Sequence, residues 1–381
     1  MDDRLLRQLK FILEIDREKN IFRQTHLSGH GRRENDAEHA WHMALCAYLL
    51  REYANEKVDI GKVMLMCLIH DLVEIEAGDT YAYDAESLKT RKAREDAAKV
   101  KLFSMLPTDQ KDDLTALFDE FEAAETPESR FAHAMDNLQP LLLNHSNGGS
   151  DWKEHQVNAQ QVHERHRQTR FGSEKLYQVS FGILLEHVRK GDLPAKPLSE
   201  MTLEELWQLF PVVLREYDPE WKQWYADEES LLREHFGSTV RIRHIGSTAV
   251  PGMTAKPTVD ILLEAAPESD PDQLIRLAKE CGYVVMSAKK ERDFRLDLCK
   301  GYTPLGFAER VFHLHIRPFG DWDEPVFCEW LKRHPESAEE YVRLKKELQV
   351  RFEHDRDAYT AAKGEFIRDC VRKARNQKPQ D

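Results

Sequence analysis

The spacing of apolar residues changes once along the chain, and this change constrains the fold more than any other feature. In the first half, apolar side chains recur at helical spacing in one segment after another, for example in residues 5–13. In the second half, short strand-like runs such as residues 258–263 stand between further helical segments. Gly, Asp and Pro are concentrated between the halves, in residues 191–197, which is typical of a linker.

This pattern predicts a multidomain chain. The predicted parts are an all-α domain at residues 1–190, a linker at 191–200, and an α/β (α+β) domain with a mixed sheet at 201–381. The length of 381 residues agrees with two domains, because single hydrophobic cores rarely grow beyond about 250–300 residues.

Composition narrows the class of protein. The chain is 41% hydrophobic and 32% charged, which is typical of a globular protein, and no apolar run approaches the roughly 20 residues that a membrane span needs. The formal net charge of -13 argues against broad binding to nucleic-acid phosphates. No secretory signal is apparent in the first residues, and none of the six cysteines forms a CxxC pair. We therefore expect reduced cysteines and a cytoplasmic protein.

An ionisable pair, His70-Asp71, ends an apolar run at residues 63–69 that must be buried. A buried carboxylate is costly unless it is paired or bound to a metal ion. Asp136 likewise interrupts an apolar helical segment, and His39 lies in another helix. A single histidine on an apolar face is more often a packed core residue. Together, however, imidazole and carboxylate groups suit a divalent cation such as Mn, Fe, Co, Ni or Zn.

Three segments carry a resemblance to a known family: RENDAEHAWH at residues 33–42, HDLVEIEAGDT at 70–80 and FAHAMDNLQP at 131–140. In order and spacing they resemble the 5′-deoxynucleotidase branch of the HD superfamily of metal-dependent phosphohydrolases, over about residues 1–188. The resemblance implies a helical domain, a nucleotide or small phosphate-ester substrate, and a homodimer.

The resemblance also implies roles for individual residues. The implied ligands of a divalent metal ion (Mn, Co, Fe, Ni, Zn or Mg) are His39, His70, Asp71 and Asp136. Glu74 and Asp79 are implied to act on water or on the leaving group. Arg23 or Arg33 is implied to contact the phosphate.

The residues alone leave alternatives open at these positions. Glu74 follows Asp71 by three residues and can share its helix face, and Asp79 lies in a predicted loop that suits proton relay. Both acids also suit a solvated helix end, and the arginines suit surface ion pairs. For His42 and His133, packing or support of a neighbouring ligand is the favoured interpretation.

The second domain has a polar cluster of its own. Residues 241–252, RIRHIGSTAVPG, predict a strand that breaks into a turn at Gly246 and Ser247. Residues 255–263 predict a second strand that carries one acid, Asp260. A Gly-Ser turn followed by an acidic strand can hold phosphate groups and their metal ion.

Two histidines of a later strand, His313 and His315, share one face because side chains alternate along a strand. They either bind a metal ion beside Asp260 or form hydrogen bonds in a pocket. Lys256 and Arg317 are candidate phosphate contacts, with surface positions as the alternative.

The longer pattern resembles the GrpB family, a branch of the nucleotidyltransferase-like fold, over about residues 199–375. Further matching segments are YDPEW at 217–221, KGYTP at 300–304 and FHLHIR at 312–317. Working nucleotidyltransferases carry Asp-x-Asp or Asp-x-Glu, whereas Leu262 stands where the second acid is expected.

Three hypotheses about function follow. The leading one is a metal-dependent phosphohydrolase that acts on nucleoside 5′-monophosphates or similar small phosphate esters and carries a nucleotide-binding second domain. In the second hypothesis the protein is bifunctional, and the GrpB-like domain transfers a nucleotidyl group. In the third, that domain is a non-catalytic regulatory module, which the missing second acid favours over active transfer.

Overall fold

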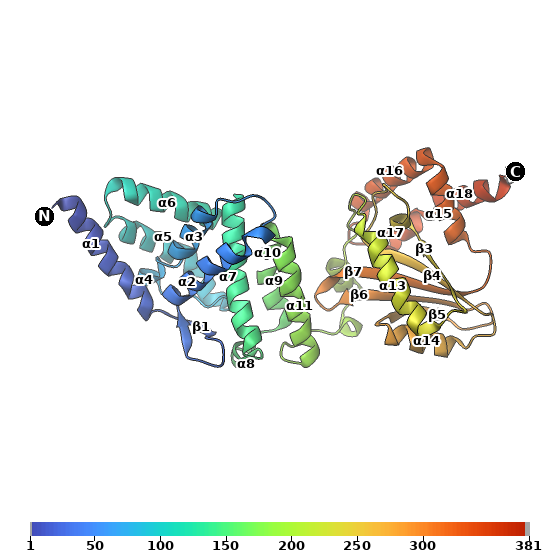
Figure 1. The fold of residues 1–381 in the computed structure, drawn as a ribbon, viewed down its shortest axis with the longest axis horizontal. Coiled ribbons are helices and arrows are strands. Elements are labelled where there is room, and N and C mark those ends of the chain that lie inside the picture. The colour runs from blue at the N-terminus through green and yellow to red at the C-terminus, as the bar shows by residue number, and fades with distance from the viewer. Residues whose placement is uncertain (1, 378–381) are drawn as a thin grey trace. The chain divides into compact units, whose positions relative to one another are not determined.

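The computed structural model describes residues 2–377, apart from the side chains of residues 85–88. The chain divides into two compact units, Met1–Ala195 and Lys196–Asp381. In Figure 1 the first unit is almost entirely helical, whereas the second contains a sheet with helices packed against it. The predicted combination of an all-α domain and an α+β domain is therefore confirmed.

The first unit is built around a core of three helices, α2, α3 and α7, in which Met43, Met66 and Met135 are fully buried. Its helices are α1 (Asp3–Ile15), α2 (Asp36–Leu50), α3 (Ile60–Ile69), α4 (Glu74–Ala77), α5 (Ala85–Phe103), α6 (Thr108–Ala123), α7 (Pro127–Ser146), α8 (Ser150–Glu154), α9 (Ala159–His166), α10 (Thr169–Gly172) and α11 (Glu174–Lys190). Short 3₁₀ turns follow α1 and α2, at Asp16–Asn20 and Arg51–Tyr53.

Two short strands, β1 (Phe22–His26) and β2 (Arg33–Asn35), form an antiparallel ribbon that leads into α2. Asn35 is the N-cap of α2: its side chain accepts a bond of 2.9 Å from the Glu38 amide, and the Glu38 carboxylate accepts one of 3.2 Å in return. This capping box fixes where α2 begins. It thereby places His39 in the first turn of the helix.

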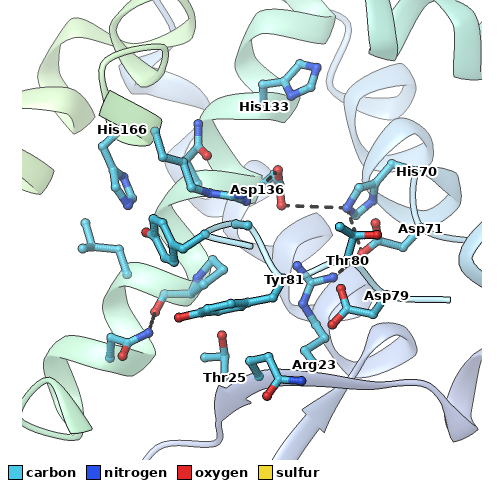
Figure 2. A pocket seen from close by; sticks show the side chains of 18 of the residues that line it. Arg23, Thr25, His70, Asp71, Asp79, Thr80, Tyr81, His133, Asp136 and His166 are labelled. Carbon is cyan, nitrogen blue, oxygen red and sulfur yellow. Dashed lines mark hydrogen bonds and ion pairs between the residues drawn. The ribbon is translucent and has the colours of Figure 1, made fainter. Parts of the chain in front are cut away.

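The apolar run at residues 63–69 forms the last turns of α3, which ends at Ile69. The chain then turns through His70–Val73 before α4 begins. The His70-Asp71 pair consequently lies at a helix end, where its side chains are directed toward α7 rather than along a continuous helix (Figure 2).

The second unit contains a five-stranded mixed sheet in the order β3-β4-β7-β6-β5. Its strands are β3 (Arg241–Ile245), β4 (Val259–Ala265), β5 (Val284–Lys289), β6 (Arg295–Thr303) and β7 (Gly306–Pro318). Strands β4 and β7 run parallel, and the other neighbouring pairs are antiparallel. The prediction of a mixed sheet is confirmed.

Helices cover this sheet, with α13 and α14 packed on the apolar face around Leu232, Ile261 and Leu314 (Figure 1). The helices are α12 (Leu203–Leu209), α13 (Glu220–Phe236), α14 (Pro271–Glu280), α15 (Asp323–Arg333), α16 (Pro335–Arg351), α17 (Arg356–Ala362) and α18 (Gly364–Asn376), with 3₁₀ turns at Leu198–Glu200 and Ser247–Ala249. All six cysteines of the chain are buried as free thiols. Among residues 2–377 no helix combines the length and the apolar character needed to cross a membrane.

Candidate metal centre and active site

Side chains from three helical segments meet in the first unit. His39 on α2, His70 after α3 and Asp136 on α7 each offer a ligand atom, and these atoms lie within 4.8 Å of one another. Asp136 Oδ1 lies 3.3 Å from His39 Nε2 and 3.9 Å from His70 Nε2. Asp71 Oδ2 lies 3.1 Å from His70 Nε2. The structure thus brings the four predicted ligands together.

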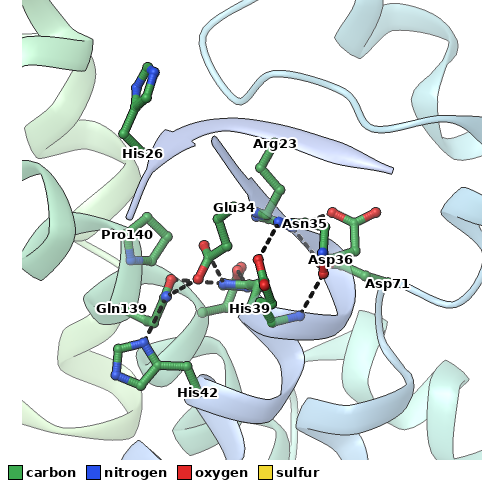
Figure 3. A network of polar contacts seen from close by, with 12 residues as sticks. Arg23, His26, Glu34, Asn35, Asp36, His39, His42, Asp71, Gln139 and Pro140 are labelled. Carbon is green, nitrogen blue, oxygen red and sulfur yellow. Dashed lines mark hydrogen bonds and ion pairs between the residues drawn. The ribbon is translucent and has the colours of Figure 1, made fainter. Parts of the chain in front are cut away.

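Each histidine is fixed by its other ring nitrogen. His39 Nδ1 bonds to Gln139 Oε1 at 2.8 Å, and His70 Nδ1 bonds to the carbonyl oxygen of Cys67 at 2.9 Å. Gln139 is itself held, because its Nε2 donates to Glu34 Oε1 at 2.7 Å (Figure 3). When both Nδ1 atoms donate, both Nε2 atoms offer lone pairs to the same point, as in metal-binding histidines.

The donor set fits a divalent cation. His70 Nε2 is buried, and although Asp71 Oδ2 lies 3.1 Å away, the nitrogen forms no well-oriented hydrogen bond within residues 2–377, a deficit that a bound metal ion would resolve. Burial opposes the ionisation of Asp136, but its interactions with His39 and Arg165 hold the pKa of this carboxyl well below its ordinary value. Two imidazoles with ionised carboxylates are typical ligands of Mn, Fe, Co, Ni or Zn.

A cavity of about 300 Å³ opens beside these side chains (Figure 2). Three arginines line it: Arg23 on β1, Arg91 on α5 and Arg165 on α9. Arg23 pairs with Asp71, and Arg165 Nη2 lies 3.5 Å from Asp136 Oδ2. Because a guanidinium group offers paired N–H donors to phosphate oxygens, this wall suits a phosphate group.

Glu74 and Asp79 also line the cavity. Glu74 opens α4 and is 4% exposed, and one of its carboxylate oxygens lies within 4.8 Å of those of Asp36 and Asp71. Burial and these two neighbouring carboxylates raise the pKa of Glu74 well above its ordinary value. Burial also raises the pKa of Asp79. Acids with raised pKa values at a cavity are suited to proton transfer.

Arg33 is not among the residues that line this cavity. It donates instead to Gln24 and, at 2.9 Å, to Glu154. Arg91 and Arg165 line the cavity although the sequence analysis did not select them. Their positions on helices far apart in the chain gave no local signal.

The two further histidines have supporting contacts. His42 Nδ1 lies 3.0 Å from Gln139 Nε2 (Figure 3). His133 bonds to the carbonyl oxygen of Phe121 at 2.8 Å and stacks on that ring. These contacts agree with packing and support of neighbouring residues.

A separate cluster lies on the sheet of the second unit. The parallel register pairs Asp260 of β4 with His313 of β7, and His315 lies two residues further on the same face. Asp260 Oδ1 lies 3.2 Å from His313 Nδ1 and 3.9 Å from His315 Nε2. A cavity of about 1320 Å³ opens over these side chains, with Gly246 and Ser247 in its wall.

Lys256 also lines this second cavity, whereas Arg317 is 5% exposed and does not. Arg317 Nη2 donates to Asp297 Oδ1 at 2.6 Å, and the same oxygen lies 2.7 Å from His315 Nδ1. Asp297 has no local sequence signal as a site residue, and the position where a second acid is expected holds Leu262. The acid comes instead from the neighbouring strand β6.

Two family models match the chain. Residues 15–177 match the model of the HD domain, and residues 211–373 match the model of the GrpB protein. In the second region, the chain is 32% identical over 161 residues to the glutamate-rich protein GrpB of Alkalihalophilus pseudofirmus, which is 41% of this chain and 91% of that protein. It is 37% identical over 152 residues to a UPF0157 protein of Pseudomonas aeruginosa, which is 39% of this chain and 62% of that protein.

The first region is similar to other proteins. It is 24% identical over 111 residues to a human 5′-deoxynucleotidase, which is 29% of this chain and 53% of that protein. The crystal structure of a predicted metal-dependent phosphohydrolase from Magnetospirillum magnetotacticum is 46% identical, with 50% of this chain and 96% of that chain covered and a TM-score of 0.49. The chain thus combines a first unit that matches the HD domain with a second unit through which it belongs to the GrpB family.

Proposed function

We propose that the first unit is a metal-dependent phosphohydrolase that releases phosphate from nucleoside 5′-monophosphates or similarly small phosphate esters. The observation that carries the proposal is the convergence of His39, His70, Asp71 and Asp136 beside a cavity lined by arginines. Similarity to the human 5′-deoxynucleotidase supports the nucleotide as substrate class. A divalent metal ion bound to these four residues would polarise the phosphoryl group and lower the pKa of water.

The size and charge of the cavity favour a small ester. Its volume of about 300 Å³ lies at the lower end of the range of about 300–1,000 Å³ for small-molecule sites. Arg23, Arg91 and Arg165 would hold the phosphate oxygens, and Tyr81 offers a ring against which a base or sugar can pack (Figure 2).

In this proposal two acidic residues act in proton transfer, Glu74 as general base and Asp79 as general acid. Glu74 lies beside Asp71 and would accept a proton from the attacking water as general base. Asp79, which also lines the cavity, would deliver a proton to the leaving 5′-oxygen. A homodimer, which the family resemblance implies, stays a prediction.

A panel of ribo- and deoxyribonucleoside 5′-monophosphates tests the proposal. The full chain would be incubated with Mn²⁺ or Co²⁺, and released phosphate would be measured for wild type, Asp71→Ala and the control Asp112→Ala, an exposed aspartate of α6. We expect release by wild type and by the control, with loss in Asp71→Ala. Release that survives Asp71→Ala undiminished, or no release from any substrate, would refute it.

A further inference from the structure

The cluster on the second unit's sheet has the arrangement of a metal centre, and the first unit's activity does not use it. Asp260, His313 and His315 each place one ligand atom within 4.8 Å of the others. Their carboxylate and imidazole atoms point at one another from adjacent parallel strands whose register is fixed by the sheet. The side chains are part-buried, and they face a cavity rather than the core.

The ring nitrogens that do not face Asp260 are both occupied. His315 Nδ1 lies 2.7 Å from Asp297 Oδ1, and Arg317 holds that carboxylate. His313 Nε2 lies 2.9 Å from the Tyr302 hydroxyl oxygen. Metal-binding histidines donate their second N–H to a carboxylate or another oxygen in this way, which leaves the first nitrogen as a lone-pair donor.

The backbone around Asp260 leaves space for this carboxylate. Gly246 adopts a left-handed conformation with φ of 72°, and a Cβ atom there would lie 2.4 Å from Asp260 Oδ2. Any side chain at this turn would therefore displace the carboxylate. The Gly-Ser turn serves to keep Asp260 accessible at the cavity floor.

Five basic side chains line the same cavity, and among residues 2–377 none of them forms an ion pair with a carboxylate. Lys345 donates to Ser247 Oγ at 3.2 Å and to the carbonyl oxygen of Thr254. Four of them, Lys256, Lys345, Lys363 and Arg356, interact electrostatically with one another, and the fifth, Arg295, lies over the ring of Trp322. Arg356 donates to the Tyr302 hydroxyl, and the two other lysines lie over the ring of Tyr359.

These cations repel one another. Burial, and then the charges of Lys363 and Arg356, lower the pKa of Lys256 to about 7. Buried and part-buried cations that form no ion pair with a carboxylate of the described residues favour the binding of an anion, since an anion would offset both their desolvation and their repulsion. Phosphate groups, with several acceptor oxygens, match this arrangement.

We propose that the second unit binds a divalent metal ion through Asp260, His313 and His315, and that the adjacent lysines and Arg356 bind phosphate groups of a ligand that is coordinated to this metal. Two nitrogen ligands favour Mn, Fe, Co, Ni or Zn over Mg, which prefers an all-oxygen site. Asp297 and Tyr302 act as positioning residues for the two histidines.

Metal binding can be measured without enzymatic activity. The full chain in His70→Ala form, with the first site disabled, would be dialysed against Co²⁺ in excess Mg²⁺, and bound Co²⁺ would be counted. We expect about one Co²⁺ per chain, which His315→Ala removes and His354→Ala, an exposed histidine of the same unit, leaves in place. Asp297→Asn should weaken binding by roughly 10- to 100-fold. Equal Co²⁺ binding in the His70→Ala chain with and without His315→Ala would overturn the proposal.

Binding of phosphate groups by the second unit is measured separately. Inorganic pyrophosphate would be titrated calorimetrically into the Mn²⁺-loaded His70→Ala chain. We expect Lys363→Met to weaken binding at least about tenfold, and Lys222→Met, an exposed lysine on α13, to leave it unchanged. Unchanged binding in Lys363→Met would refute the phosphate role. The difference in bound Co²⁺ between wild type and His70→Ala measures the first site alone. Loss of metal binding at one site can therefore be distinguished from loss at the other.

Discussion

Gln139 offers a test of how the first metal site is positioned. This residue is fully buried, and it accepts from His39 Nδ1 at 2.8 Å while donating to Glu34 at 2.7 Å (Figure 3). Replacement by Leu keeps most of the volume but leaves both partners without their hydrogen bonds. Each unsatisfied buried group costs about 1–3 kcal/mol, so the first unit should lose stability.

The larger consequence concerns the metal. Without an acceptor at Nδ1, His39 is free to change tautomer and ring orientation, which typically weakens metal affinity by about 10- to 100-fold, or about 1.4–2.7 kcal/mol. We would measure Co²⁺ affinity by competition in a His315→Ala background, so that only the first site contributes.

The matched control is Gln178→Leu, which removes one part-buried bond of 2.7 Å to Glu174 on α11. Affinity in this control should equal that of the parent chain. An affinity of Gln139→Leu within twofold of the parent would refute the role assigned to the Gln139 bridge.

Two further predictions concern stability. A Cβ atom at Gly172 would lie 2.2 Å from the Arg130 carbonyl oxygen, so Gly172→Ala should lower the free energy of unfolding, measured in urea, by about 1–3 kcal/mol. The control Gly182→Ala, with open space around the added Cβ atom, should raise the free energy of unfolding by roughly 0.5–1 kcal/mol. Equal effects of the two substitutions would contradict the packing of α10 against α7. Burial, with the charges of Lys363 and Lys256, lowers the pKa of Lys345 to about 7, so between about pH 7 and 10 the unfolded state binds more protons than the folded state. The stability of wild type relative to Lys345→Met should therefore rise by up to about 1.4 kcal/mol per pH unit in this window, and a difference that does not change with pH would show that Lys345 stays charged.

The predicted metal ligands of the first unit could be selected from the sequence because part of their signal is local. The His70-Asp71 pair ends an apolar run, and Asp136 interrupts another, so burial of an ionisable group follows from the immediate neighbours. The arginines that line the cavity had no such local signal, because Arg91 and Arg165 come from helices that only the tertiary fold brings to one cavity.

The ribbon of β1 and β2 explains the position of Arg33. Neither strand shows alternating apolar residues, so the sequence pattern did not predict them. In the observed register Arg33 pairs with His26, at the far end of the ribbon from the Phe22–Asn35 pair. There it meets Glu154, while Arg23 near the other end reaches Asp71.

In the second unit, residue alternation correctly placed His313 and His315 on one face, and the parallel register of the structure puts Asp260 beside them. The alternation of a single strand does not reveal which strand will lie beside it. Asp297 could therefore be assigned to the cluster only once β6 was seen next to β7.

The most direct test of the first unit's function couples metal occupancy to hydrolysis. Metal-free full chain would be titrated with Co²⁺ while phosphate release from a nucleoside 5′-monophosphate is followed, for wild type, His70→Ala and the control His354→Ala. We predict that release rises with Co²⁺ occupancy in wild type and in the control, and that His70→Ala stays at the background rate. Release that does not depend on Co²⁺, or that persists in His70→Ala, would contradict a phosphohydrolase built on His39, His70, Asp71 and Asp136.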